Sequence, residues 1–447
     1  MTQTTFSATA TRVASEASDF ARARRSMAGG VSSPVRAGTA VGGAPPVIAR
    51  ARGSRIFDAE DREYIDYLCA YGPVLLGHAD ERIAAAVDRA CRQGAVLGGT
   101  HSEEIRLAER LGEAMPSMQR VRFVSTGTEA CASAVRVARA FTGRLKIVRF
   151  AGNYHGHSDA MIFNAGAASN SRADARAGIT QGVAGDVIAL PYDDLQTLGA
   201  ALSREGDRVA AVILEPVVGN MGLVLPSDGY LSGVRSLATR HGALLIFDEV
   251  ITGFRLGLGG AQELFGVKPD VTCVGKVLGG GLPIAAFGGR ADVMAVLAPD
   301  GHVFQGGTFS GNPVCVAAAH ALLDAIESDP LFYNRLSAKG SRLARGARHA
   351  LADAGLDFPV VQLGSIVDFM FRHGGAHRTF DEAKQADARS YARYYWAMLE
   401  RGVFLPPSQM EVMFLTAAHS DEDIDRTVDA MRNALLALAE GADASRP

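Results

Sequence analysis

Three absences narrow the possible functions: paired cysteines, long apolar runs and an excess of one charge. The 447 residues include five cysteines, at positions 69, 91, 131, 273 and 315, and no two of them form a Cys-x-x-Cys pair. Neither a disulfide framework nor a cysteine-based zinc site is indicated, and this usage predicts a reducing cytoplasmic location. No apolar run reaches about 18 residues, which argues against a membrane span. The first 20 residues lack the apolar core of a secretion signal.

The charge balance excludes a second group of functions. Lysine and arginine number 45 against 48 acidic residues, for a formal net charge of −3. No basic stripe predicts a nucleic-acid partner, and no basic segment predicts binding to a membrane surface. We therefore expect the partners to be small molecules.

The middle of the chain alternates short apolar runs with helical stretches. Because buried strands that alternate with helices form parallel sheets covered on both faces, the pattern predicts an α/β fold. In such folds ligands bind beyond the carboxyl ends of the strands, so functional residues should follow the apolar runs. These runs are residues 120–126, 146–150, 209–216, 243–250 and 270–275.

Three parts of the chain are predicted from these changes of pattern. Residues 61–325 would form a large domain, whereas residues 326–447 combine long amphipathic helices with short strands. Residues 1–60, with a β-hairpin continuing to residue 68, would join the C-terminal part in a smaller α+β domain.

The stretch STGTEA, residues 125–130, stands between a predicted strand and a predicted helix. Backbone N–H groups at a helix N-terminus bind anions, and the hydroxyls of Thr126 and Thr128 on either side of Gly127 would add donors. A simple capped helix start explains this motif equally well.

The stretch FAGNYHGHSD, residues 150–159, also follows an apolar run. Tyr154, followed by His155, could offer an aromatic face to a planar ligand. His155, His157 and Asp159 are the alternative, as metal ligands, but no zinc-binding pattern supports them and we predict no metal.

Two charged residues end the next apolar runs. Asp248 closes a fully apolar strand, where a carboxylate is costly without a cationic partner. A helix-capping aspartate is the alternative, which the second charged residue at the strand end, Glu249, makes weaker. Lys276 follows the next strand, and a desolvated lysine amine can form a Schiff base with an aldehyde. Without the other motifs, the favoured interpretation of Lys276 is a structural lysine that packs its aliphatic part and extends its amine to solvent.

Together, the four features match the needs of one cofactor. Pyridoxal 5′-phosphate needs an anion site, a stacking ring, an acid beside its pyridine nitrogen and a lysine for its aldehyde. The chain supplies these in order with its 125–130 turn, Tyr154, Asp248 and Lys276. The sequence therefore predicts an enzyme that uses pyridoxal 5′-phosphate or its amino form, pyridoxamine 5′-phosphate.

These motifs resemble those of the class III aminotransferases, which are enzymes of pyridoxal-phosphate fold type I. The resemblance rests on DEVITGFR (248–255), VGKVLGGG (274–281) and GTFSGNP (307–313), and extends over residues 20–435. It implies an α/β fold with a mainly parallel seven-stranded sheet, a smaller α+β domain formed by both termini, and a homodimer whose subunits share the active site.

The resemblance also implies roles for individual residues. Lys276 would carry the cofactor and move protons, Asp248 would pair with the pyridine nitrogen, and Val250 and Tyr154 would cover the two ring faces. The remaining cofactor-binding positions would be Asn220 near the phenolic oxygen, His155, and Thr126, Gly127 and Thr128 at the phosphate, completed by Gly307 and Thr308 from the partner subunit.

Substrate contacts are implied at four positions. Ser33 and Arg36 match residues that meet the substrate carboxylate, which suits an arginine fork. Tyr71 lies at the expected mouth of the site, and Glu411 matches an acid near the substrate amine.

Within the family, further motifs favour an aminomutase, which exchanges an amino group within one substrate. Three departures favour instead a transaminase acting on a β-amino acid or another amino acid with 2-oxoglutarate or pyruvate. Tyr71, preceded by Ala70, replaces the usual tryptophan, and LGGTHS (97–102) introduces His101. The segment 164–186, which matches a gating loop, lacks the usual prolines and carries Arg172 and Arg176.

Two further classes are less well supported. A catalytically silent binding protein of the same fold would be expected to lack the lysine or its aspartate. A dinucleotide-dependent dehydrogenase would need Gly-x-Gly-x-x-Gly after its first strand, and the glycines of RLGLGG (255–260) are wrongly placed for that role.

Overall fold

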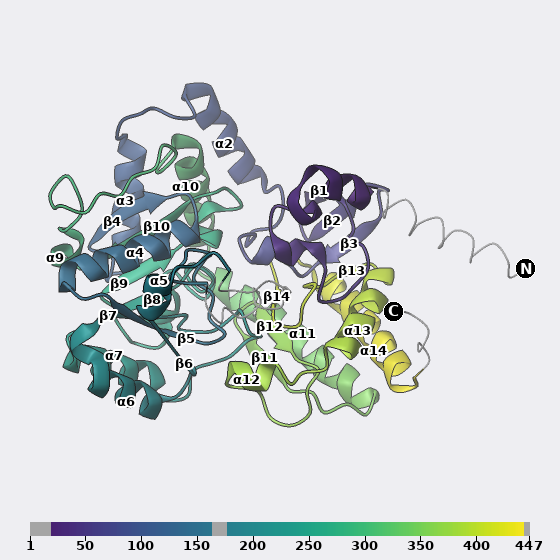
Figure 1. Cartoon of the computed structure of the whole chain (residues 1–447). Helices are drawn as coiled ribbons and strands as arrows, with labels where there is room; N and C mark the ends of the chain where they lie inside the picture. Colours follow the sequence, from purple (N-terminus) through teal and green to yellow (C-terminus); the bar gives the residue numbers. More distant parts are fainter. Residues whose placement is uncertain (1–18, 163–176, 442–447) are drawn as a thin grey trace, which may run out of the picture.

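The structure is a computed structural model that describes residues 19–162 and 177–441. A seven-stranded sheet forms the centre of the larger part (Figure 1). Its strands run in the order β4 (Arg120–Val124), β10 (Ala285–Gly289), β9 (Val271–Val274), β8 (Leu244–Asp248), β7 (Val209–Leu214), β5 (Lys146–Phe150) and β6 (Val187–Leu190).

All neighbouring pairs from β9 to β6 are parallel, whereas β10 is antiparallel to both β4 and β9. The predicted α/β class and the mainly parallel sheet are therefore confirmed. Because β10 is inserted between two strands of the same direction, β4 also ends at the edge where β5, β7, β8 and β9 end. That shared edge collects the segments that follow those five strands.

Helices cover both faces of this sheet, as the apolar composition of its strands requires. One face packs on α4 (Gly127–Thr142) and α9 (Ala291–Met294). The other face packs on α3 (Ser102–Ala114) and α10 (Pro313–Glu327) over β4, β9 and β10, and on α6 (Leu195–Glu205) and α7 (Tyr230–Arg240) over β5, β7 and β8. The remaining helices of this part are α2 (Glu81–Gln93), α5 (Gln181–Gly185) and α8 (Gly260–Leu264).

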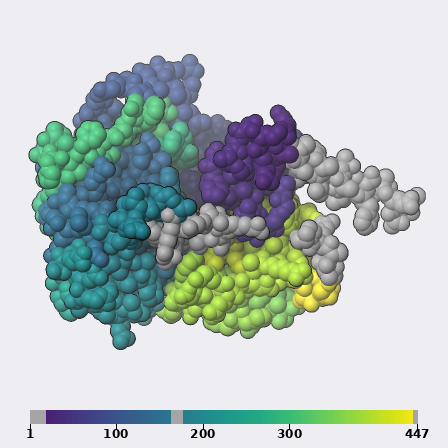
Figure 2. All heavy atoms as spheres, in the orientation of Figure 1, coloured from purple at the N-terminus to yellow at the C-terminus, as the bar shows by residue number. Residues whose placement is uncertain are grey.

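Segments from the two ends of the chain share a second core. Buried side chains of residues 41–67 pack together with those of residues 343–435. Figure 1 shows these early and late segments apart from the large sheet, and Figure 2 shows them on the same side of the molecule. The first sheet here has the order β1 (Ile48–Arg52), β2 (Arg55–Asp58), β3 (Glu63–Asp66) and β13 (Val403–Phe404). The second has β11 (Val360–Leu363), β12 (Ile366–Phe369) and β14 (Met413–Phe414), and the helices are α11 (Phe332–Asp353), α12 (Phe380–Ala383), α13 (Ala388–Glu400) and α14 (Asp421–Ala439).

The predicted hairpin is formed by β2 and β3, which pair antiparallel. This shared core supports a small domain built from both termini, while the divisions at residues 60 and 325 stay predictions. No helix among residues 19–162 and 177–441 has the length and apolarity that crossing a membrane requires. Most of the predicted gating segment, including Arg172 and Arg176, lies outside the described residues.

Candidate active site

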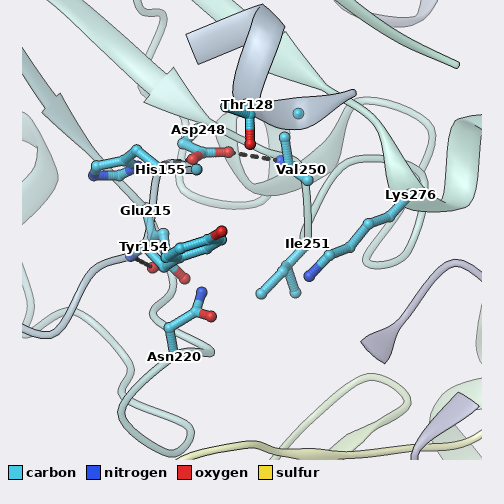
Figure 3. A pocket seen from close by; sticks show the side chains of 11 residues that line it. Thr128, Tyr154, His155, Glu215, Asn220, Asp248, Val250, Ile251 and Lys276 are labelled. Atoms are coloured by element: carbon cyan, nitrogen blue, oxygen red, sulfur yellow. Dashed lines mark hydrogen bonds and ion pairs between the residues drawn. The ribbon is translucent and has the colours of Figure 1, made fainter. Parts of the chain in front are cut away.

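One pocket opens at the edge of the large sheet where the strands end (Figure 3). Eight of the predicted site residues line it: Gly127, Thr128, Tyr154, His155, Asn220, Asp248, Val250 and Lys276. They come from five separate segments, at or after the ends of β4, β5, β7, β8 and β9. The pocket also contains three residues without a predicted role: Gly156, Glu215 and Ile251.

Lys276 reaches into the pocket from the side opposite His155 and Asp248 (Figure 3). Its backbone has a φ of 43°, a left-handed conformation that is strained for a lysine and is typical of functional sites. The neighbouring Gly275 packs closely, since a Cβ there would lie 3.2 Å from the Cβ of Ala285. Burial lowers the pKa of the Lys276 amine, which Glu411, Glu215 and Asp248 partly oppose. The residue is thus held as a desolvated amine among carboxylates, as a nucleophilic lysine requires.

Asp248 ends β8 and is almost completely buried. Its Oδ2 atom lies 2.7 Å from Nδ1 of His155 and accepts from the Cys131 thiol at 3.3 Å, while Oδ1 accepts from the Val250 N–H at 3.0 Å. A carboxylate offers about four acceptor positions, so three donors leave one position. Because Asp248 lines the pocket, that position is available to a ligand N–H.

Cys131, His155 and Asp248 place their ligand atoms within 4.8 Å of one another, which is compatible with a metal ion. The two hydrogen bonds on Asp248 already link these three side chains. His157 and Asp159, the other residues of the metal alternative, are exposed and do not belong to this group. The geometry thus favours a hydrogen-bonded carboxylate at this position.

Glu215, which follows β7, is the main pocket residue missed from the sequence. It accepts from the N–H of Tyr154 at 2.8 Å and from the N–H of Gly219 at 2.9 Å. Burial and the nearby Asp248 raise its pKa to about 7, against these hydrogen bonds and one from Asn220. Glu215 therefore fixes the segments that carry Tyr154 and Asn220 on one side of the pocket.

The helix α4 begins at the opposite end of the pocket. Thr126 is its N-cap, and the Thr126 hydroxyl and the Glu129 carboxylate form a capping box. Thr126 is exposed and does not line the pocket, whereas Gly127 and Thr128 do. The N–H groups of a first helical turn lack intrahelical acceptors and bind anions. Gly156 leaves room for Thr128, since a Cβ there would lie 2.5 Å from the Thr128 hydroxyl.

The four predicted substrate residues do not line this pocket, but three of them interact near it. Burial raises the pKa of the Tyr71 hydroxyl, Glu411 raises it further and Arg36 lowers it. Burial also raises the pKa of Glu411 to about 7, which Lys276 opposes. Tyr71 has a φ of 67° and ends a run of three non-glycine residues with positive φ. Ser33 is the N-cap position of the short 3₁₀ helix Pro34–Ala37, which contains Arg36.

Gly307 and Thr308 lie outside the pocket and are exposed. Their loop is held by side chains of the large sheet and its helices. Arg136 donates to the Phe304 carbonyl at 3.2 Å, Arg122 to the Gln305 carbonyl at 3.0 Å, and His101 lies 2.9 Å from the Gly311 carbonyl. The loop is thus fixed in a position that leaves Gly307 and Thr308 exposed and outside this pocket.

The residues present fit pyridoxal 5′-phosphate. The pocket combines a lysine amine, a carboxylate with one free acceptor position, an aromatic ring and a helix N-terminus. Asp248 would face the pyridine nitrogen, Tyr154 and Val250 the ring, and Gly127 and Thr128 the phosphate. This fit rests on the donors and acceptors of the chain itself.

Comparisons with known proteins agree with this site. The model of the family "Aminotransferase class-III" matches residues 39–435. Glutamate-1-semialdehyde 2,1-aminomutase of Sorangium cellulosum is 48% identical over 419 residues, covering 94% of this chain and 95% of that protein. The protein of the same name from Desulforudis audaxviator is 47% identical over 416 residues, covering 93% and 96%.

Two solved structures illustrate the range of similar folds. An omega-transaminase from Sphaerobacter thermophilus has a TM-score of 0.86 and 33% identity, covering 95% of this chain and 98% of that chain. A glutamate-1-semialdehyde aminomutase from Pseudomonas aeruginosa has a TM-score of 0.82 and 28% identity, covering 95% and 94%. The chain therefore belongs to the class III aminotransferase family, and it is a pyridoxal-phosphate-dependent enzyme.

Proposed function

We propose that this enzyme is a glutamate-1-semialdehyde 2,1-aminomutase, which exchanges the amino group within its substrate and releases 5-aminolevulinate, the precursor of tetrapyrroles. The observation that carries the proposal is the meeting of Lys276, Asp248 and Tyr154 in one pocket. The choice of substrate is supported by the aminomutases that are 47–48% identical over more than nine-tenths of the chain. The free thiols of the described chain are in keeping with a cytoplasmic location.

Each of the predicted site residues would have a separate chemical role. When bound, the cofactor withdraws the electrons released as a substrate C–H bond breaks. Asp248 holds the proton of the pyridine nitrogen, and Tyr154 and Val250 keep the ring in place. Lys276 takes up and returns the proton at the reacting carbon, because burial lowers the pKa of its amine and so favours the uncharged form that accepts a proton. Arg36 would bind the substrate carboxylate at the mouth, with Ser33 and Tyr71 beside it.

Glu411 would act as the acid near the substrate amine. Its pKa of about 7 means that it can hold or release a proton under working conditions. Glu411 raises the pKa of Lys276 and Lys276 lowers the pKa of Glu411, as expected of two opposite charges that stabilise each other's ionised forms. A substrate amine that enters as a cation would favour the ionised form of Glu411.

A transaminase is the second candidate, since Tyr71 and Ala70 change the mouth of the site and similar solved structures include transaminases. The test supplies glutamate-1-semialdehyde to the holoenzyme without any amino donor or acceptor. We expect repeated turnover to 5-aminolevulinate, because an internal exchange consumes no second substrate. No product, together with activity on β-amino acids and 2-oxoglutarate or pyruvate, would support the transaminase and contradict the aminomutase.

The enzyme would function as a homodimer in which Gly307 and Thr308 complete the phosphate site of the partner. In support, their loop also exposes two aromatic side chains, Phe304 at 77% and Phe309 at 61%. Exposed apolar groups of this size commonly mark protein contacts. The three hydrogen bonds that hold the loop would orient it before association.

Mixing two inactive variants tests this shared site. Lys276→Ala removes the amine, and Thr308→Asp places a negative charge against the phosphate of the other subunit. Each variant alone should be inactive, while random mixing should restore about a quarter of the sites, since half of the dimers are hybrids with one intact site each. Hybrids isolated with two different tags but without activity would contradict the shared site.

A further inference from the structure

Arg149 is buried without an opposite charge at contact distance. It lies on β5, its side chain is fully buried, and no carboxylate among residues 19–162 and 177–441 forms an ion pair with it. Its Nη2 atom donates to the Asn153 carbonyl at 2.5 Å, but Nε and Nη1 have no hydrogen-bond partner among those residues. An unpaired guanidinium in a protein interior costs several kcal/mol, so a purely structural role accounts poorly for its presence.

The sheet places Arg149 on the same face as the carboxylates of the pocket. Side chains alternate along a strand, and Ile147 packs on the face covered by α4, so Arg149 points to that face as well. On the neighbouring strands Ala211 and Ile213 of β7 and Leu244 and Ile246 of β8 share this face. Glu215, just after β7, is two residues beyond Ile213, and Asp248, at the end of β8, is two residues beyond Ile246. Both side chains therefore continue the alternation toward the same face. In the sheet order β8, β7, β5, Arg149 lies level with Ile213 and Ile246, so Glu215 and Asp248 lie one step further along the same face.

Hydrogen bonds connect these charged groups to the consecutive residues Asn153, Tyr154 and His155, of which the last two line the pocket. Arg149 holds the carbonyl of Asn153, whose Oδ1 accepts from the N–H of Glu215 at 2.9 Å. Glu215 in turn accepts from the N–H of Tyr154, and His155 contacts Asp248. Arg149 therefore stands at the start of a chain of contacts that ends at the carboxylate facing the cofactor.

The protonation state of His155 is the property that the charge of Arg149 can influence. A carboxylate only accepts, so Nδ1 of His155 carries the proton that lies between the ring and Asp248. In an uncharged imidazole Nε2 then carries a lone pair, and Nε2 has no partner among the described residues. A charged imidazole would compete with the pyridine nitrogen for the negative charge of Asp248.

We propose that Arg149 is a positioning residue that keeps His155 uncharged, so that the negative charge of Asp248 remains available to the cofactor. The pKa of His155 is lowered by burial, raised by its hydrogen bond to Asp248 and by the charge of Asp248, and lowered again by Arg149. The Cys131 thiol is the remaining titratable group against Asp248. An ordered water between the guanidinium and Nε2 would satisfy unpartnered atoms on both sides. The inference concerns the cofactor site and is independent of which substrate is used.

Two variants of the holoenzyme separate charge from shape. Arg149→Met removes the charge and keeps an unbranched side chain, whereas Arg149→Lys keeps the charge. We expect the pH at which His155 titrates, followed by NMR of the ring nitrogens and by cofactor absorbance, to rise measurably in Arg149→Met, because the remaining influences on His155 are unchanged. In Arg149→Lys it should change by no more than a few tenths. Unchanged titration in a folded Arg149→Met enzyme would overturn the proposal.

Arg149→Met leaves the buried Glu215 carboxylate without its nearby cation, which destabilises the fold, so a second comparison is included. The double variant Arg149→Met with Glu215→Gln removes both charges of opposite sign and should fold. Its His155 titration is compared with that of Glu215→Gln alone, so that the difference reports only Arg149. A difference of zero would overturn the proposal, and a rise in the double variant would support it.

Discussion

Replacing Lys276 with alanine is expected to lower the turnover number by at least about 1,000-fold while the folded structure persists. The pocket holds no other amine among its lining residues, so no neighbouring group can replace it. Removal of a desolvated amine also relieves a burial cost, which should leave the stability close to that of the original enzyme. Small primary amines added to the solution should restore part of the lost rate.

Peptide mapping gives a direct chemical measurement of the same residue. After borohydride treatment of the original holoenzyme, we expect the cofactor to be attached to the peptide that contains Lys276. Lys268→Ala is the matched control, because Lys268 is exposed on the approach to the same strand. That control should keep both the adduct and the rate. A normal rate in Lys276→Ala, or an adduct on a different peptide, would show that the role is wrongly assigned.

The sequence predicted the residues that combine strong chemistry with a place after an apolar run. Tyr154, Asp248 and Lys276 satisfy both conditions, and the structure brings them into one pocket. Glu215 satisfies them too, because it follows the apolar strand 209–214, but no role was predicted for it. The same physical signal that identified Asp248 could have identified it.

Arg149 shows a limit of reasoning from patterns. Within KIVRF (146–150) it interrupts an apolar run, and period-two alternation cannot say which face of a doubly covered sheet receives it. Its role depends on the order of β5, β7 and β8, which the sequence does not reveal. The hydrogen bond from Cys131 to Asp248 could not be predicted either, because the sequence of α4 is that of an ordinary buried helix.

The antiparallel strand β10 was not predicted either, although chain length offered a clue. Only about ten residues separate the end of β9 from β10, and a parallel crossover needs about a dozen or more. Its sequence, AAFGG, has few of the β-branched residues that mark strands. Packing against β4 and β9 on both sides supplies the stabilisation that its composition does not.

Asp248→Asn is the second substitution with a large expected effect. Asparagine keeps the size of the side chain but removes the negative charge that a protonated pyridine nitrogen requires. We expect turnover to fall by about 100- to 1,000-fold, because the ring then withdraws electrons less strongly in the transition state. The absorbance of the bound cofactor should also change its dependence on pH, since the ring nitrogen would lose its proton more readily.

The control for this substitution is Asp270→Asn at the opposite edge of the same sheet. Asp270 is equally buried and forms ion pairs with Arg235 and Arg290, but it precedes β9 instead of following it. Asp270→Asn should lower the unfolding temperature and leave turnover of the folded enzyme within about twofold. Asp248→Asn should instead lower turnover strongly and change the unfolding temperature less. Equal losses of turnover in both variants would mean that Asp248 acts through stability alone. A cofactor spectrum in Asp248→Asn with the same pH dependence as that of the original enzyme would show that Asp248 does not act on the ring nitrogen.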